Sequence, residues 1–192
     1  KLSDARKTVL ASLEKQVKQL LGEVGMQDAT LSVAHTFDTD TYLSASGADA
    51  IQFLFSANKG SSLQDIKKVA SGGELSRLML CIKSLLANSI ALPTLIFDEI
   101  DTGVSGEVAH KVGGVLMRLA DNHQLIAITH LPQIASKGNH HLFVYKTSDG
   151  KSTHTHIKAL TKQERIEEIA KMLSGESPTP AAIKNAKELM GV

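Results

Sequence analysis

The 192-residue chain is 42% apolar and carries 21 Lys and Arg against 20 Asp and Glu, so its formal net charge is only +1. This composition is typical of a globular protein with about one domain, and it excludes a basic field over the whole molecule, although a local basic patch stays possible. Aromatic residues make up 4% of the chain and Trp is absent, which argues against a base-stacking surface of exposed rings.

The single cysteine, Cys81, has no partner for an intrachain disulfide. The sequence also lacks a signal-peptide pattern and any apolar run near the roughly 18 residues of a membrane span. We therefore expect a reducing, cytoplasmic setting and no membrane partner. The chain begins at Lys1 without an initiator Met, which predicts a fragment or a processed piece.

Near the start of the chain, apolar residues recur in alternating steps of three and four, at Leu10, Leu13, Val17, Leu20 and Val24. This is the a/d spacing of a coiled coil, but it lasts only about two heptads where a secure assignment needs ~3–4. An amphipathic helix lying on a domain explains the spacing equally well.

After Gly25 the period changes to two, which predicts antiparallel strands around residues 31–35 and 51–57. A helical period returns from Glu74 and predicts a helix whose apolar stripe is bordered by Cys81. The members of that stripe are Leu75, Leu78, Met79, Ile82, Leu85 and Leu86. Pro93 ends this helix before a short apolar strand at residues 94–97.

A second amphipathic helix is expected at about residues 106–119, followed by a buried strand at residues 124–129. Strand, helix and strand imply a parallel pair with a right-handed crossover. A hairpin is expected around residues 148–150, and two helices finish the chain, the last with Thr179 as N-cap and Pro180 in the first turn. These elements predict an α/β fold.

Two carboxylates, Asp98 and Glu99, follow the apolar strand at residues 94–97. The carboxyl edge of a parallel sheet is where ligands of open α/β folds bind. Asp98 there would suit Mg²⁺, and Glu99 could orient and deprotonate an attacking water. A solvated acidic turn explains the pair about equally well.

Two glycines precede the helix that begins near residue 74. Ser71, Gly72 and Gly73 could present a hydroxyl and free backbone N–H groups to an anion. Ser71 and Glu74 also match a capping box, so a capped glycine turn is the plainer explanation of this stretch alone. The phosphate loop G-x-x-x-x-G-K-[ST] is absent from the sequence.

Histidines gather in the second half of the chain. His130 follows a predicted buried strand, where a histidine with satisfied hydrogen bonds is the plainer interpretation of that residue alone. His140, His141, His154 and His156 flank the predicted hairpin and raise the question of a metal site. No suitably spaced Cys or carboxylate accompanies them, so we expect exposed strand histidines.

In their order along the chain, "SGGEL", "TLIFDE", "DTGVSG" and "ITH" resemble the ATP-binding-cassette superfamily, and its SMC-like branch in particular. There these segments are the signature motif, the Walker B strand, the D-loop and the switch-histidine loop. The resemblance extends over nearly the whole chain, including the "FLFSAN" strand and the "IEEIAKML" helix. Transporter cassettes are less similar, because they usually carry Gln where this chain has Glu74.

The resemblance implies the C-terminal lobe of an ABC/SMC-type ATPase head, with parallel core strands, flanking helices, antiparallel hairpins and a coiled-coil-like first helix. Residues 1–25 would be the returning end of a coiled coil, and residues 26–192 would form the lobe. The missing phosphate loop would come from an N-terminal lobe of the same protein. We therefore expect no ATP hydrolysis by this chain alone.

ATP and Mg²⁺ are the implied ligands. Carried over residue by residue, Asp98 would be the Mg²⁺ partner, Glu99 the base for the hydrolytic water, and His130 a γ-phosphate contact. Asp101 would sit at a dimer interface and link the two sites. The signature would grip the nucleotide of a second copy of the head through Ser71, Gly72, Gly73 and Glu74.

The implied function is that of a cytoplasmic, nucleoid-associated ATPase in DNA double-strand-break repair and recombination. ATP binding would clamp two heads together and hydrolysis would release them. DNA is a partner by resemblance alone, and no residue can be assigned to it. Two other classes stay open, a transporter-type nucleotide-binding domain and a non-catalytic dimerisation module. Glu74 argues against the first, and the intact Asp98, Glu99 and His130 argue against the second.

Overall fold

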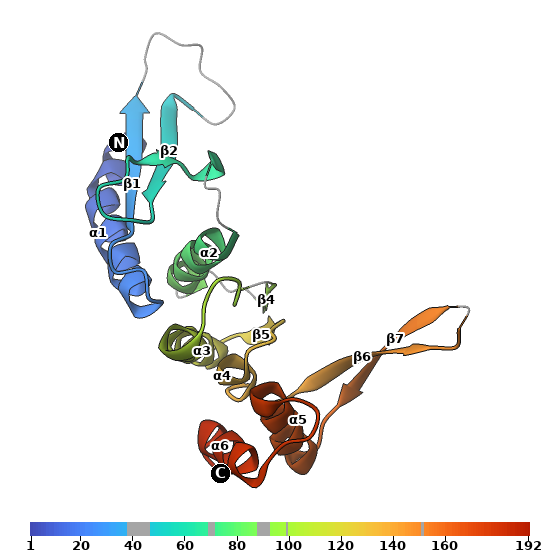
Figure 1. Ribbon diagram of the computed structural model, residues 1–192. Coiled ribbons are helices and arrows are strands. Elements are labelled where there is room, and N and C mark those ends of the chain that lie inside the picture. The colour runs from blue at the N-terminus through green and yellow to red at the C-terminus, as the bar shows by residue number, and fades with distance from the viewer. Residues whose placement is uncertain (38–46, 69–71, 88–92, 99, 151) are drawn as a thin grey trace.

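The computed structural model describes residues 1–37, 47–68, 72–87, 93–98, 100–150 and 152–192 (Figure 1). The helices are α1 (Leu2–Glu23), α2 (Gly72–Ala87), α3 (Gly106–Ala120), α4 (Pro132–Ala135), α5 (Lys162–Ser174) and α6 (Pro180–Met190). The strands are β1 (Thr30–Phe37), β2 (Asp49–Ser56), β3 (Gln64–Asp65), β4 (Thr94–Phe97), β5 (Gln124–Ala127), β6 (Leu142–Ser148) and β7 (Thr153–Ala159), with a 3-10 turn at Ile66–Lys68. This mixture confirms the predicted α/β class.

Strands β1 and β2 form the predicted antiparallel pair, with Leu31 opposite Phe55, and β3 adds a short third strand. Burial along the apolar face of β2 is uneven. Phe55 is 3% exposed, whereas Ile51 on the same face is 44% exposed. The Phe55 end of the face packs into the hydrophobic core, whereas polar side chains of the other end contact α1 (Figure 1).

Strands β4 and β5 are parallel, with Phe97 opposite Ala127, and α3 connects them. The strand–helix–strand prediction is therefore confirmed, although β5 ends two residues earlier than expected. Helix α3 buries one apolar face, formed by Ala109, Val112, Val115, Leu116 and Leu119. Leu95 and Phe97 of β4 are buried in the same core, which fixes one face of the two-stranded sheet.

Helix α2 buries only part of the predicted stripe: Leu78 is in the core and Ile82 and Leu85 pack against it. Leu80 and Cys81 are fully buried, whereas Met79 is 36% and Leu86 44% exposed. The helix packs on α1, and the face it turns toward that helix and the core is the one that carries Leu78 and Cys81. Burial raises the pKa of the Cys81 thiol to about 12, so this thiol stays protonated and unreactive.

Helix α1 lies along the β1–β2 pair and is joined to it by a cluster of polar side chains (Figure 1). His35 Nε2 lies within hydrogen-bond distance of the Asp49 carboxylate, at 2.8 Å, and Arg6 forms an ion pair with the same carboxylate. Hydrogen bonds from Ser3, Arg6 and His35 lower the pKa of Asp49 to about 2, against the opposing effect of desolvation. At the other end of α1, Val17 and Leu21 are buried in the core.

The C-terminal helices α5 and α6 pack on each other around a second, smaller core centred on Ile169 and Ala186. The Thr179 hydroxyl accepts a hydrogen bond from the Ala182 amide and Pro180 opens α6, as predicted. The β6–β7 hairpin, also predicted, projects away from the body (Figure 1). The fold thus places β4, β5 and α2 near the middle of the molecule, between these two ends.

Candidate functional site

The carboxyl ends of β4 and β5 meet at one edge of the parallel pair. The ladder continues past the last paired residues, because the Ile128 amide donates a 2.9 Å hydrogen bond to the Phe97 carbonyl. Asp98 directly follows β4 and is exposed. His130 follows β5 by three residues, so the acidic turn and the histidine loop leave the sheet at the same edge. A ligand bound there could touch both segments.

Asp101 is the buried centre of this edge, with an exposed fraction of only 3%. Its Oδ2 accepts hydrogen bonds of 2.6 Å from the Thr129 hydroxyl and 2.8 Å from the His130 amide. The same oxygen lies 3.1 Å from His130 Nδ1, within ion-pair distance. One carboxylate oxygen therefore holds the backbone and the side chain of the histidine loop against the acidic turn.

The side chain of His130 is 76% exposed, although its Nδ1 faces a buried carboxylate. The ring therefore has one side fixed by the protein and the other side open to solvent. Thr129 was not singled out from the sequence; its hydroxyl also accepts a 3.0 Å hydrogen bond from the Leu131 amide. In the sequence, Thr129 could have been identified by its position directly before His130 in the "ITH" segment.

Helix α2 begins against the turn that carries Asp101. A Cβ atom on Gly73 would lie 2.0 Å from the Thr102 carbonyl oxygen, whereas a Cβ on Gly72 would meet nothing within 4 Å. Gly73 therefore serves close packing within the chain, and Gly72 is the exposed glycine that a ligand could approach. The sequence pattern did not distinguish these two roles.

Arg77, one turn along α2, was also missed by the sequence analysis. Burial lowers the pKa of its guanidinium, with the charge of Glu74 opposing that effect. Within the part of the chain that the structure describes, its Nε and Nη1 are buried and have no hydrogen-bond partner. A buried guanidinium without hydrogen-bond partners is destabilising. Arg77 would therefore stabilise the start of α2 only if another group accepted hydrogen bonds from it.

Two of the predicted site residues, Ser71 and Glu99, lie outside the described residues. The capping box that pairs Ser71 with Glu74 is therefore a prediction that the structure does not address. Glu74 itself lies in the first turn of α2 and is half-buried.

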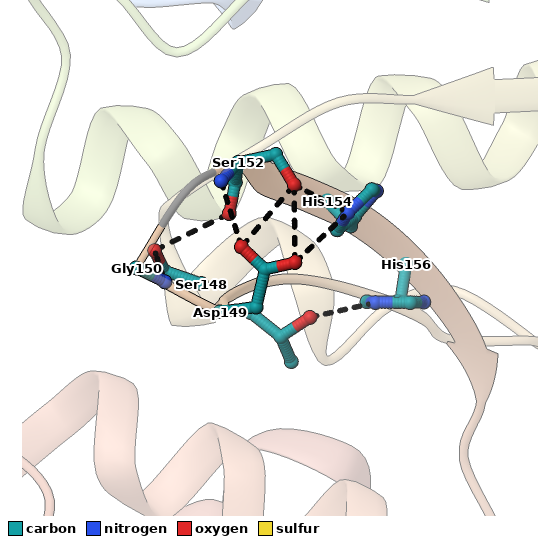
Figure 2. Close-up of polar contacts among 7 residues, drawn as sticks. Ser148, Asp149, Gly150, Ser152, His154 and His156 are labelled. Atoms are coloured by element: carbon teal, nitrogen blue, oxygen red, sulfur yellow. Dashed lines mark hydrogen bonds and ion pairs between the residues drawn. The ribbon is translucent and has the colours of Figure 1, made fainter.

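The histidines of the hairpin are held by hydrogen bonds near its tip, as Figure 2 shows. His154 Nε2 lies 2.8 Å from the Ser152 hydroxyl, and His156 Nε2 lies 2.8 Å from the Thr147 hydroxyl. His156 also stacks on Tyr145, with ring centroids 5.2 Å apart. Among the residues that the structure describes, no group of three or more potential metal ligands occurs. His154 and His156 are exposed residues of β7, as expected, whereas His140 and His141 precede β6 and His141 is half-buried.

A hollow of about 540 Å³ lies away from this edge, between the 136–140 segment and helices α5 and α6. Its polar lining includes Lys137, Lys162, Arg165 and Glu188, and none of its lining residues belongs to the edge formed by β4 and β5. The Arg165 guanidinium is already occupied by the carbonyls of Gly138 and Asn139. The sheet edge, rather than this hollow, gathers Asp98, Asp101 and His130.

None of the helices in the described part of the chain combines the length and the apolar content that a membrane crossing requires.

Comparison with known sequences identifies homologues over nearly the full chain. The chain is 41% identical over 190 residues to the DNA repair protein RecN of Vibrio cholerae, 44% identical over 189 residues to that of Rickettsia conorii, and 36% identical over 203 residues to that of Bacillus subtilis. These matches cover 98–99% of this chain but 34–35% of each relative. The chain thus spans about a third of the length of these curated relatives. No family model matches it.

Solved structures with a similar fold are head domains of Smc proteins. The Smc head domain of Pyrococcus yayanosii, solved with a coiled coil and joint, gives a TM-score of 0.63 at 17% identity over 85% of this chain and 29% of that one. The Smc head domain of Pyrococcus furiosus, bound to the C-terminal domain of ScpA, gives 0.61 at 14% identity over 90% of this chain and 40% of that one. The lobe therefore has the fold of part of an Smc head.

Proposed function

Because this chain is homologous to about a third of the RecN DNA repair proteins and has an Smc head fold, we propose that it is the C-terminal lobe of an ATPase head. In this proposal the whole protein is a bacterial, SMC-like ATPase of DNA double-strand-break repair and recombination. Residues 1–25 are the returning end of its coiled coil, and residues 26–192 form the lobe.

The observation that carries this proposal is the shared edge of β4 and β5. Asp98 follows one strand, His130 follows the next, and the buried Asp101 connects the two segments. Nucleotide hydrolysis needs charged groups that are held in place before the nucleotide arrives. A carboxylate braced by three contacts within the chain meets that requirement, and an acidic turn that is merely solvated would not.

The donor groups at this edge fit Mg²⁺ and ATP. Asp98 is an exposed carboxylate, the kind of oxygen ligand that Mg²⁺ takes together with phosphate oxygens. When bound, the ion would neutralise charge on the phosphates. Asp98 would hold it directly or through water, Glu99 would act as base for the hydrolytic water, and His130 would face the γ-phosphate region.

The N-terminal lobe of the same protein is proposed as the first partner. The β4–β5 pair has only two strands among the described residues, and the outer face of the pair leaves Ile96 58%, Ile126 43% and Ile128 56% exposed. Parallel sheets are normally covered on both faces, and two strands alone are marginal. The exposed isoleucines therefore support a covering lobe, which would also bring the phosphate loop.

A second copy of the head is proposed as the second partner, joined through ATP. Gly72 is exposed at the start of the 16-residue helix α2, whose N-terminal N–H groups favour an anion. Ser71, Gly72, Gly73 and Glu74 would contact the nucleotide held by the other copy. In the completed protein, Ser71→Arg should abolish ATP-driven dimerisation, measured by light scattering, and leave ATP binding intact. Normal dimerisation of this variant would contradict the assignment.

DNA is proposed as a partner because the relatives are named as DNA repair proteins, and a cytoplasmic, nucleoid-associated location follows from that proposal. No described residue is assigned to DNA.

Reconstitution tests the function as a whole. This chain alone should hydrolyse ATP no faster than background, because the loop that holds the β- and γ-phosphates lies elsewhere. Addition of the N-terminal lobe should restore turnover, measured as phosphate release. Hydrolysis by the isolated chain that depends on Glu99 would overturn the two-lobe assignment, and an inactive completed protein would overturn the ATPase assignment.

A further inference from the structure

The contacts of Asp101 point to a role for this residue that differs from a dimer contact. Its carboxylate is buried within its own chain, and its oxygen Oδ2 accepts two hydrogen bonds from the histidine loop and lies 3.1 Å from the His130 ring nitrogen Nδ1. We propose that Asp101 is a positioning residue that keeps the proton of the neutral His130 ring on Nδ1 and turns Nε2 outward as a hydrogen-bond acceptor. This inference rests on the proposed ATPase function.

The argument for the tautomer begins with the distance of 3.1 Å between His130 Nδ1 and Asp101 Oδ2. If Nδ1 lacked a proton, its lone pair would lie against an oxygen of Asp101, a residue that is only 3% exposed. With the proton on Nδ1, the same geometry is attractive. Which ring nitrogen of a neutral histidine carries the proton is set by the partner of the other nitrogen, so the buried carboxylate decides it.

The ring is also held in place by its own backbone. The His130 amide donates to the same Oδ2 at 2.8 Å, and the Thr129 hydroxyl donates to it at 2.6 Å. These two hydrogen bonds prevent the loop from moving the ring away from the carboxylate. Because the side chain is 76% exposed, nothing in the described chain competes for Nε2 on the opposite side of the ring.

The tautomer restricts what His130 can do for a nucleotide. A neutral ring with its lone pair at Nε2 accepts a hydrogen bond, and it cannot donate one to an oxygen of the γ-phosphate. A water molecule positioned beside the γ-phosphate is the group that fits such an acceptor. In its neutral form, His130 would therefore accept a hydrogen bond from the attacking water, with Asp101 behind it as the group that orients the ring.

Nitrogen NMR of the imidazole rings in this chain tests the assignment directly. In alkaline buffer, where imidazoles are neutral, the spectrum of His130 should show a protonated Nδ1 and an unprotonated Nε2. Asp101→Asn removes the charge that selects this form, so the proton should move to Nε2 or divide between the two nitrogens. Asp28→Asn, an equal charge change at an exposed turn residue, should leave the His130 signals unchanged.

The wild-type spectrum decides the question even if Asp101→Asn does not fold. A wild-type His130 with its proton on Nε2, or with the mixture of forms shown by free histidine, would overturn the proposal. A second wild-type measurement is hydrogen exchange of the His130 amide, which should be protected although it lies outside every helix and strand. Free exchange of this amide would show that Asp101 does not hold the loop.

Activity of the completed two-lobe protein separates this inference from the proposed function. Asp101→Asn should lower kcat by roughly 10²-fold, the scale expected when a reacting group is misplaced by about 1 Å, with little change in KM. A wild-type kcat in this variant, with the tautomer changed, would overturn the positioning role and leave the ATPase assignment standing. The expected tautomer in a completed protein without ATPase activity would overturn only the proposed function.

Discussion

Two Asp–His pairs in the described part of the chain have a buried carboxylate, and they differ in what surrounds the histidine. In the first, Asp49 and His35 have side chains that are 6% and 2% exposed, and Arg6 completes the cluster. In the second, Asp101 is 3% exposed but the His130 side chain is 76% exposed. The first pair ties α1 to the β1–β2 sheet, and the second presents a ring to solvent at the edge of the β4–β5 pair.

We infer that burial of the histidine, rather than the pair itself, separates a structural role from the catalytic role proposed for His130. A carboxylate behind a buried ring can only strengthen a contact between two elements. A carboxylate behind an exposed ring fixes the orientation of a group that a ligand can reach. The residues of the second pair should therefore control chemistry and those of the first should control stability.

The largest expected effect lies beside the second pair. In the completed protein, Glu99→Gln should lower single-turnover ATP hydrolysis by about 10²–10⁴, the usual cost of losing a general base. ATP should still bind, so a long-lived ATP-bound dimer should accumulate. Asp98→Asn should instead weaken Mg-ATP binding. Hydrolysis at the wild-type rate by Glu99→Gln would show that Glu99 is not the base.

Separate substitutions of His35 and His130 by glutamine test the comparison between the two pairs. His130→Gln should lower hydrolysis in the completed protein by about 10²-fold. It should change the free energy of unfolding by less than about 0.5 kcal/mol, as for most exposed positions. His35→Gln should do the reverse, with a lower midpoint of thermal unfolding and unchanged hydrolysis by the protein that remains folded. Equal losses of activity in both variants would remove the distinction between the pairs.

Packing of α2 against the acidic turn gives a smaller effect, measured on stability. Gly73→Ala places a Cβ 2.0 Å from the Thr102 carbonyl oxygen, so it should destabilise the chain by about 1–3 kcal/mol through overpacking. Gly72→Ala is the matched control, because a Cβ there meets nothing within 4 Å. Urea unfolding of both variants measures the difference. Equal stability of the two would mean that α2 does not rest on this turn.

The smallest expected effect is the pH dependence of the first pair. The pKa of Asp49 is lowered from 3.8 to about 2, so its charged form stabilises the folded chain above pH 3.8. That contribution should be lost as the pH falls from 3.8 through about 2. The Asp49→Asn variant lacks this contribution, so the difference in free energy of unfolding between the wild type and the variant should shrink over this pH range. Chemical unfolding at each pH measures that difference. A difference that stays constant would show that Asp49 is not held as predicted.

Most of the secondary structure could be predicted from local pattern alone. The apolar run at residues 94–97, the amphipathic helix after Gly106 and the capped helix after Thr179 all appear as expected. Each depends on residues within one or two turns of each other, so hydrophobic period and capping chemistry are sufficient.

The buried face of α2 could not be predicted with the same accuracy. Met79 and Leu86 are as apolar as Leu80, yet they are exposed and Leu80 is fully buried. A helix that is apolar on most sides can turn any of several faces inward. The choice was made by its contact with α1, which is distant in the sequence.

The sequence by itself determined the candidate site residues and, through the order of the motifs, to which proteins the chain is similar. Only the tertiary structure decided what each of them touches. Asp101 meets Thr129 and His130 because the parallel register sets Phe97 opposite Ala127, and Gly73 differs from Gly72 because the Thr102 backbone lies against only one of them. Such contacts arise between segments about 28 residues apart, whose alignment depends on strand pairing and core packing rather than on local preference.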